Sequence, residues 1–135
     1  MTTAPADAQV IGPRTAAGCV AVHGSPALIT VRGRLTLRHV PGPPDFESIQ
    51  RGDEDRPTLI LLLPDGICVD DGGDFADASE RFATAHVWSL DPAVRRTLQH
   101  NIGRQVMITG RAYARNNALH SAPLVLEATA LTMTR

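Results

Sequence analysis

Hydrophobic and polar residues alternate along two stretches of the chain, as they do in strands with one buried face. In residues 29–38 every second position is apolar or glycine, and threonine or arginine stands between them. Residues 105–113 follow the same period. Each stretch carries a glycine in its middle, Gly33 and Gly110, which indicates a bulge or a sharp bend in the strand.

Three more apolar segments predict strands. Residues 58–63 form a continuous run, which predicts a strand covered on both faces, with the connection 41–57 as the expected cover. Residues 64–66, Pro-Asp-Gly, interrupt this run, and residues 67–69 resume extended structure. The remaining strands are expected at residues 83–90 and 123–133.

One helix is predicted between the third and fourth of these five strands. Asp91 is a suitable N-cap and Pro92 fits the first helical position. Gly103 fits the position just after a helix, where glycine favours the left-handed backbone. The apolar residues of the face that we expect to be buried are Val94, Leu98 and Ile102.

This order of elements predicts a mainly β fold, a five-stranded OB-fold-like barrel with one helix between strands 3 and 4. A small β-sandwich is the alternative, but it leaves the helix unexplained. The chain of 135 residues suits one domain. We expect residues 19–135 to form that domain and residues 1–18, which show no period, to be a flexible N-terminal segment.

Charge is unevenly distributed along the chain, although the net charge is only −1. Residues 41–80 hold eleven acidic residues and two arginines, whereas the rest hold eleven arginines and three acidic residues. Such polarity can steer a charged partner, although acidic residues also favour solvated loops without any further role. All thirteen basic residues are arginine, which is typical of proteins from GC-rich bacterial genomes.

The long connection between the first two strands is the most informative segment. Residues 41–53 contain three prolines together with Phe46 and Ile49, which are large enough to be buried. A connection of this length and composition is more typical of a shaped functional loop than of a slack one.

Four segments of the chain carry a family resemblance: residues 31–35, 41–49 with Gly52-Asp53, 67–69 and 103–110. Together they resemble an uncharacterised bacterial family, domain of unknown function 4431, over roughly residues 19–132. The resemblance implies a secreted, periplasmic or lipid-anchored protein, in a family whose members are sometimes joined to lysozyme-inhibitor-like modules. The chain departs from the family in two places. The acidic residue and the aromatic residue that usually follow Gly-Asp are displaced at residues 52–58, and the histidine-rich turn is reduced at residues 116–121, so we carry over no role for a histidine cluster.

The two cysteines predict a disulfide. Cys19 precedes the first strand and Cys68 ends the second, and these strands are neighbours in an OB barrel. The bridge would close a loop of about 50 residues and contribute on the order of 2–4 kcal/mol. It fits an oxidising compartment, which favours a periplasmic or secreted location, with the cytoplasm as the alternative. Two unrelated buried thiols remain the other interpretation.

The composition excludes several other classes. No apolar run approaches the roughly 20 residues of a membrane-spanning helix, and no signal peptide is recognisable at the start. The acidic residues 70–74 lack the spacing of an EF-hand. We expect no enzyme, no cofactor and no metal, because the histidines stand singly and without a metal-binding motif. They are His23, His39, His86, His100 and His120.

Two binding hypotheses remain. The first is a protein-binding module of the cell envelope, possibly an inhibitor or immunity protein, whose acidic, proline-stiffened loop blocks a secreted cationic hydrolase or toxin; its contact residues would be Asp45, Phe46, Glu47, Asp53, Glu54 and Asp55. In the competing interpretation Phe46 and Ile49 only close one end of the barrel. The second hypothesis is a binder of single-stranded nucleic acid or another anion through an arginine face of Arg32, Arg34, Arg38, Arg111 and Tyr113.

Overall fold

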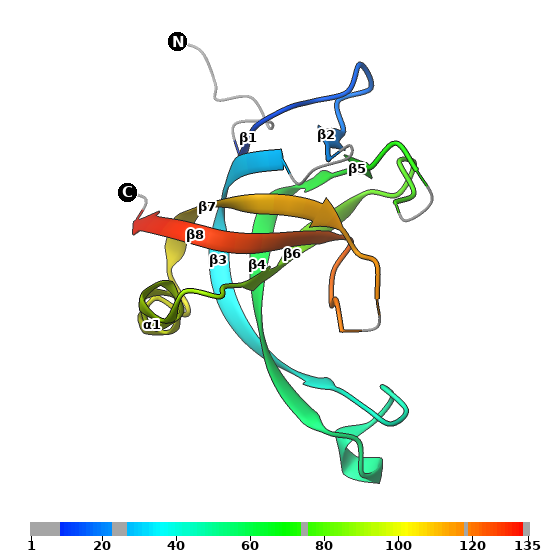
Figure 1. Ribbon diagram of the computed structural model, residues 1–135, viewed down its shortest axis with the longest axis vertical. Helices are drawn as coiled ribbons and strands as arrows, with labels where there is room; N and C mark the ends of the chain where they lie inside the picture. Colours follow the sequence, from blue (N-terminus) through cyan, green and yellow to red (C-terminus); the bar gives the residue numbers. More distant parts are fainter. Residues whose placement is uncertain (1–8, 23–26, 74–75, 118, 134–135) are drawn as a thin grey trace.

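Five strands of the protein close into a barrel. The structure is a computed structural model and describes residues 9–22, 27–73, 76–117 and 119–133. Figure 1 shows the barrel, in which β3, β4, β6, β7 and β8 surround one core. Their bounds are Ala27–Pro41 (β3), Asp55–Ile67 (β4), Phe82–Trp88 (β6), Gln105–Ala114 (β7) and Leu124–Met133 (β8), with the helix α1 at Pro92–His100.

The order of strands confirms the OB-fold-like barrel that the sequence predicts. Around the sheet the order is β3-β4-β6-β8-β7, and β7 pairs again with β3, so the sheet closes on itself. Strands β6 and β8 are parallel, whereas the other barrel pairs are antiparallel. The helix connects β6 to β7, as expected. A closed sheet leaves no place for the sandwich alternative.

The apolar residues of the alternating strands fill the interior of the barrel. Within the barrel, the inward side chains of β3 and β7 are buried, among them Val31, Leu35 and Ile108. Leu98 of α1 is also fully buried and packs on this core. Asp91 caps the helix by accepting a hydrogen bond from the Ala93 amide. The hydrophobic period therefore predicted both the strands and the face that each strand buries.

The two mid-strand glycines are required by close backbone approach. A Cβ at Gly33 would collide with the carbonyl oxygen of Leu62, and one at Gly110 with the carbonyl oxygen of Glu127. The ladder between β7 and β8 shifts register between Thr109 and Gly110, which confirms a bulge there. At Gly33 and its neighbour, β3 exchanges pairing with β7 for pairing with β4.

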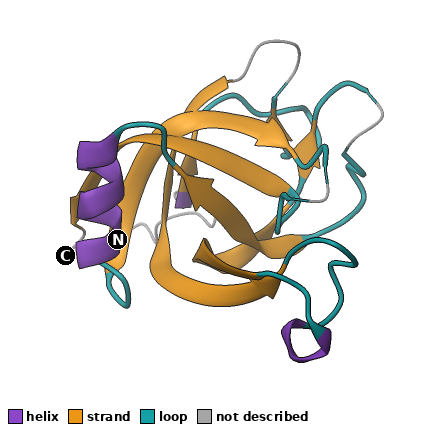
Figure 2. Ribbon diagram, turned by 60° about the horizontal axis from the view of Figure 1, so that its bottom comes forward, coloured by secondary structure: helices purple, strands orange, loops and turns teal. Residues whose placement is uncertain are grey.

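Strands β3 and β4 continue beyond the barrel as a two-stranded arm. They stay paired as far as Pro41 and Asp55, whereas β6 accompanies β4 only as far as Leu59. Figure 1 shows the arm projecting below the barrel, with the short 3-10 helix η2 (Ile49–Arg51) near its end, and Figure 2 shows the same helix standing clear of the strands. We use "arm" for residues 38–58 from here on.

The arm corrects one expectation. Residues 42–54 lie at the end of the arm and do not close an end of the barrel (Figure 1). The outer face of β4 and β6 is covered instead by the loop 115–123, of which residue 118 lies outside the described residues. This loop is hydrogen bonded to Arg56 and His86. The cover is incomplete, since Leu62, on the outer face of β4, is only partly buried.

Short strands extend the barrel at its other end. Strand β1 (Val10–Ile11) pairs with β3, and β2 (Val20–Ala21) pairs in parallel with β5 (Val69–Asp70). Part of the segment expected to be flexible is thus ordered, because Val10 is buried in the core. Cys19 and Cys68 form the predicted disulfide, with Cα atoms 4.6 Å apart. Residues 1–8 lie outside the described residues.

Candidate functional site

The end of the arm is organised around the carboxylate of Asp53. One oxygen accepts the backbone N–H of Asp45 at 3.0 Å, and the other accepts those of Glu47 at 2.8 Å and Ser48 at 2.9 Å. The hydrogen bond from the Ser48 amide, followed by that from Glu47, lowers the pKa of Asp53. Asp53 is only 7% exposed. Asp53 therefore supports the loop from inside, which corrects its expected place on the contact surface.

Backbone hydrogen bonds complete this fixed loop. The amide of Gly42 donates to the Glu54 carbonyl at 2.7 Å, and the amide of Glu54 donates to the Pro43 carbonyl at 2.9 Å. The peptide bond between Pro43 and Pro44 is cis, and Gly52 has a φ of 107°. The loop therefore has a defined conformation made by its own backbone and one carboxylate.

Phe46 is presented outward by this loop in an unusual backbone conformation. Its φ is 57°, the only positive φ of a non-glycine residue among those described. An aromatic residue in this region is uncommon, so the surrounding loop must hold Phe46 in this conformation. The residue is 37% exposed, and its neighbours Asp45 and Glu47 are exposed as well. We call Asp45, Phe46 and Glu47 the arm tip.

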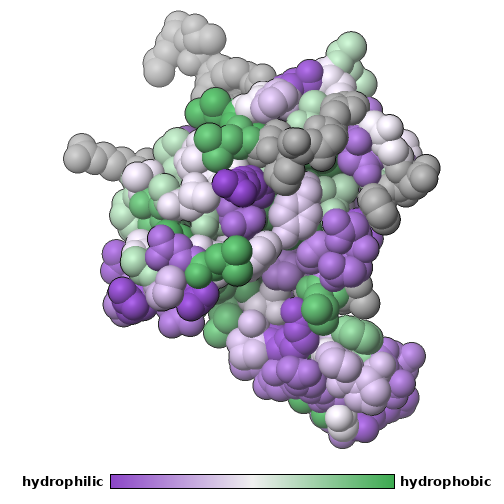
Figure 3. Space-filling model, viewed as in Figure 1, coloured by the Kyte–Doolittle hydropathy of each residue, from purple (hydrophilic) through white to green (hydrophobic). Residues whose placement is uncertain are grey.

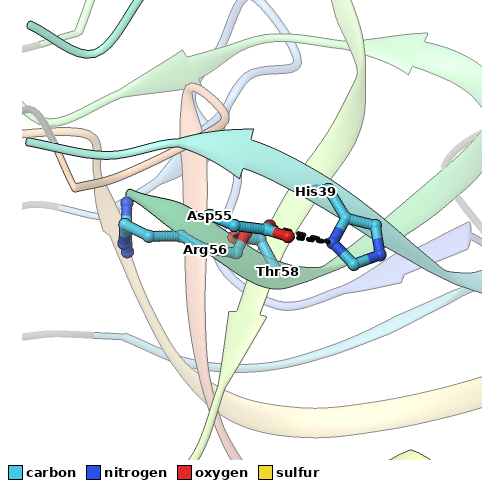
Figure 4. A network of polar contacts seen from close by, with 4 residues as sticks. All are labelled: His39, Asp55, Arg56 and Thr58. Carbon is cyan, nitrogen blue, oxygen red and sulfur yellow. Dashed lines mark hydrogen bonds and ion pairs between the residues drawn. The ribbon is translucent and has the colours of Figure 1, made fainter. Parts of the chain in front are cut away.

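The last two residues of the predicted acidic surface lie on the stem of the arm. Asp55 accepts a hydrogen bond from, or forms an ion pair with, Nδ1 of His39 at 2.9 Å, and both side chains are about half exposed (Figure 4). Glu54 is exposed beside it. The structure therefore brings Asp45, Phe46 and Glu47 together, and it places Glu54 and Asp55 further along the arm.

The predicted arginine face is not one surface. Arg32, Arg34 and Arg38 are all exposed on β3, but Arg111 pairs opposite Leu28, at the end of β3 furthest from Arg38. Tyr113 faces a different neighbour: its hydroxyl accepts a hydrogen bond from the Trp88 indole at 2.7 Å. The stripe on β3 therefore lacks the aromatic partner expected of a nucleic-acid surface.

A second polar cluster lies on the outer face of the barrel, where the sequence predicted none. Nδ1 of His86 accepts the backbone N–H of Ser121 at 3.0 Å, and Nδ1 of His120 accepts that of Asn116 at 3.1 Å. The ring of His120 also stands edge-on to those of His86 and Tyr113. Alternation alone would have placed His86 and Tyr113 outward, but nothing in the sequence brings His120 to them.

Burial keeps these histidines neutral. It lowers the pKa of His86 to about 4, with smaller effects from the charges of His120 and Arg56. Burial, followed by Arg115, also lowers the pKa of His120. A neutral ring can accept through its unprotonated Nδ1, whereas the protonated ring cannot. The loop 115–123 is thus attached to the barrel through neutral His86, and neutral His120 holds the turn within the loop.

Neither cluster has the geometry of a metal site. Within the part of the chain that the structure describes, no three histidine, cysteine or acidic side chains converge as ligands would. None of the helices described is long and apolar enough to cross a membrane.

The chain was compared with protein-family models, with curated proteins and with solved structures, and none of the three comparisons gave a match. The resemblance to the family of unknown function 4431 therefore stays a prediction.

Proposed function

We propose that this protein is a non-enzymatic protein-binding module, and that its arm tip docks into a basic cleft of a partner. The partner that fits best is a cationic secreted enzyme or toxin, so the protein would act as an inhibitor or immunity protein. The observation that carries the proposal is Phe46, held outward in a left-handed conformation between the exposed residues Asp45 and Glu47.

Preorganisation supports this function. A loop fixed by Asp53 and by its own backbone loses little conformational entropy when it docks. An aromatic anchor surrounded by charges is the arrangement found at many binding hot spots, where the ring supplies affinity and the charges guide the approach. The surplus of acidic residues between positions 41 and 80 favours a cationic partner.

The disulfide supports the compartment that this function needs. A bridge between Cys19 and Cys68 persists in oxidising surroundings, as in the periplasm or outside the cell. We therefore propose a periplasmic or secreted location, with the cytoplasm as the alternative.

The test measures binding to a panel of purified cationic peptidoglycan hydrolases, lysozymes included, and to proteins captured from secreted fractions. Phe46→Ala should weaken binding of the partner by roughly 30-fold, as expected for a hot-spot aromatic. Glu47→Ala with Glu54→Ala should slow association and flatten its dependence on salt. The matched control, Asp65→Ala with Glu80→Ala, removes the same charge from exposed sites outside the arm.

Equal binding by wild type and the Phe46→Ala protein would show that the arm tip is not the contact surface. The alternative function, binding of single-stranded nucleic acid through Arg32, Arg34 and Arg38, is tested in parallel with a labelled oligonucleotide. It is supported by the exposure of those three residues on one strand, and it requires that their replacement by glutamine reduces the salt dependence of binding.

A further inference from the structure

A cleft opens where the arm leaves the barrel, beside the helix α1. Its volume is about 520 Å³, within the range of small-molecule sites. The base of the arm forms one wall and α1 the other, and the end of β6 lies between them. In Figure 3 the outline of the molecule narrows at this place, between the body and the lobe formed by the arm. The cleft is remote from the arm tip, so its role is independent of the proposed function.

The cleft has an apolar floor that is open to solvent. Leu37 and Leu59 come from the arm side, and Leu98 and Ile102 from the helix side. Leu37 is 43% exposed and Ile102 is 38% exposed, although both continue the period of residues that are buried elsewhere. Leu37 stays exposed because β3 and β4 continue past the last pairing of β4 with β6. Exposed apolar side chains in a concave site are typical of a surface that takes an apolar group.

The charged side chains that line the cleft are cationic. Arg56 and Arg95 line it, and no aspartate or glutamate does. Nη1 of Arg95 donates to the carbonyls of Ser89 and Leu90, and Nη2 of Arg56 donates to the carbonyl of Leu119. Neither guanidinium forms an ion pair with a carboxylate among the residues described. Nη1 of Arg56 is buried without any hydrogen-bond partner in that part of the chain.

The remaining titratable side chain of the lining does not change the positive charge of the cleft. His86 lines the cleft as well, and its burial, with smaller effects from His120 and Arg56, lowers the pKa of the ring and keeps it neutral. Two uncompensated guanidiniums beside an apolar floor attract a negative charge attached to an apolar body. They disfavour a cation, and an uncharged sugar would leave the apolar floor unmatched.

We propose that this cleft binds an amphipathic anion, in which a single carboxylate, sulfate or sulfonate head meets Arg56 and Arg95. The apolar body of the ligand lies on Leu37, Leu59 and Ile102. Trp88 stands at the same cleft with its indole N–H held by Tyr113 at 2.7 Å, so its ring is a fixed wall for the ligand.

Trp88 also supplies the measurement, because it is the only tryptophan of the chain. Sodium decanoate below its micelle concentration should change the Trp88 fluorescence in a saturable way. Decanol, which has the same apolar body without the charge, should bind at least tenfold more weakly. Decyltrimethylammonium, with the opposite charge, should not bind.

Variants then locate the head group. Arg95→Gln and Arg56→Gln should each weaken decanoate binding about tenfold, and Arg111→Gln, an exposed arginine on β7, should leave it unchanged. Gln99→Glu adds a carboxylate at an exposed helical position of the lining, so it should weaken decanoate without disturbing the fold. Circular dichroism of every variant verifies folding.

Three results would overturn the proposal. Equal affinity for decanoate and decanol would leave only an apolar groove, and unchanged binding by both Arg95→Gln and Gln99→Glu would place the anion elsewhere. A fluorescence change with vesicles of phosphatidylcholine and phosphatidylglycerol, but none with decanoate, would identify a membrane surface in place of a free ligand. If Phe46→Ala loses binding to a protein partner, that result says nothing about decanoate binding in the cleft. Failure of the cleft proposal is therefore distinct from failure of the proposed function.

Discussion

Two loops of this protein use the same device with different chemistry. In the loop 42–54 a carboxylate, Asp53, accepts three backbone N–H groups, and the loop points away from the barrel. In the loop 115–123 two neutral histidines accept one backbone N–H each, and the loop lies over the barrel. An acceptor fixes each loop, and the residues 45–47 beside the carboxylate-held turn are exposed to solvent.

Because one acceptor is a carboxylate and the other a histidine, the two loops should respond differently to acid. Asp53 keeps its hydrogen bonds until the carboxylate is protonated, and its pKa is lowered below 3.8. His86 stops accepting when its ring is protonated, at a pKa of about 4 in the folded protein against 6.5 ordinarily. The histidine-held loop therefore contributes less to stability at mildly acidic pH, whereas the carboxylate-held loop does not change there.

The largest effect is expected from a change in the barrel, which supports both loops. Gly110→Val places a β-branched side chain against the carbonyl of Glu127, and backbone cannot yield easily. We expect a loss of about 3 kcal/mol or more in the free energy of unfolding, measured by urea denaturation. Arg111→Val, at the exposed neighbouring position, is the control and should change stability little. A stable Gly110→Val protein would contradict the closed barrel.

Removal of the disulfide should cause the second largest loss of unfolding free energy, and it should leave the conformation of both loops unchanged. Cys19→Ser with Cys68→Ser is expected to cost about 2–4 kcal/mol, since the bridge closes a long loop of the unfolded chain. Hydrogen exchange should show faster exchange around β2 and β5 and unchanged protection in the two loops. Intact mass after alkylation without reductant checks the bridge itself, and two alkylated thiols would refute it.

Acidification should weaken the histidine-held loop by a smaller amount. The folded protein binds the proton of His86 less readily than the unfolded chain does, so stability is complete above pH 6.5 and is lost as the pH falls from 6.5 toward 4. Allowing for solvent screening, we expect roughly 1–2 kcal/mol from this residue.

Other groups also titrate in this range, so the prediction compares two variants. The dependence of unfolding free energy on pH should become shallower in His86→Gln and remain unchanged in His100→Gln, whose side chain is exposed at the end of α1. Equal slopes in both proteins would mean that His86 does not hold the loop.

The smallest effect on global stability is expected at the arm. Asp53→Asn replaces one accepting oxygen by a donor, so the amides of Glu47 and Ser48 should exchange faster while the barrel keeps its melting temperature. Asp55→Asn is the matched control, because among the described residues that carboxylate is hydrogen bonded only to the exposed His39. Unchanged exchange in Asp53→Asn would show that the backbone alone fixes the arm tip.

Much of the fold could be predicted because it rests on local patterns. The alternation around Gly33 and Gly110 predicted two barrel strands together with their bends, and the caps at Asp91 and Pro92 predicted the start of the helix. The pairing of Cys19 with Cys68 followed from the predicted strand order. The candidate site was predicted only in part: Asp45, Phe46 and Glu47 do lie together, whereas Asp53 turns inward and Tyr113 lies away from the arginine stripe.

The sequence by itself determined where the five barrel strands lie and which side of β3 and β7 is buried, because hydrophobic period acts over neighbouring residues. It also determined the acidic character of the arm. It did not predict the short strands β1 and β2. Only the tertiary structure decided that β3 and β4 remain paired beyond the end of β6. It also decided that His86 accepts a hydrogen bond from a backbone amide 35 positions away, and that an apolar cleft with two arginines opens beside α1. Those features depend on strand lengths and on contacts between distant segments, which no local pattern encodes.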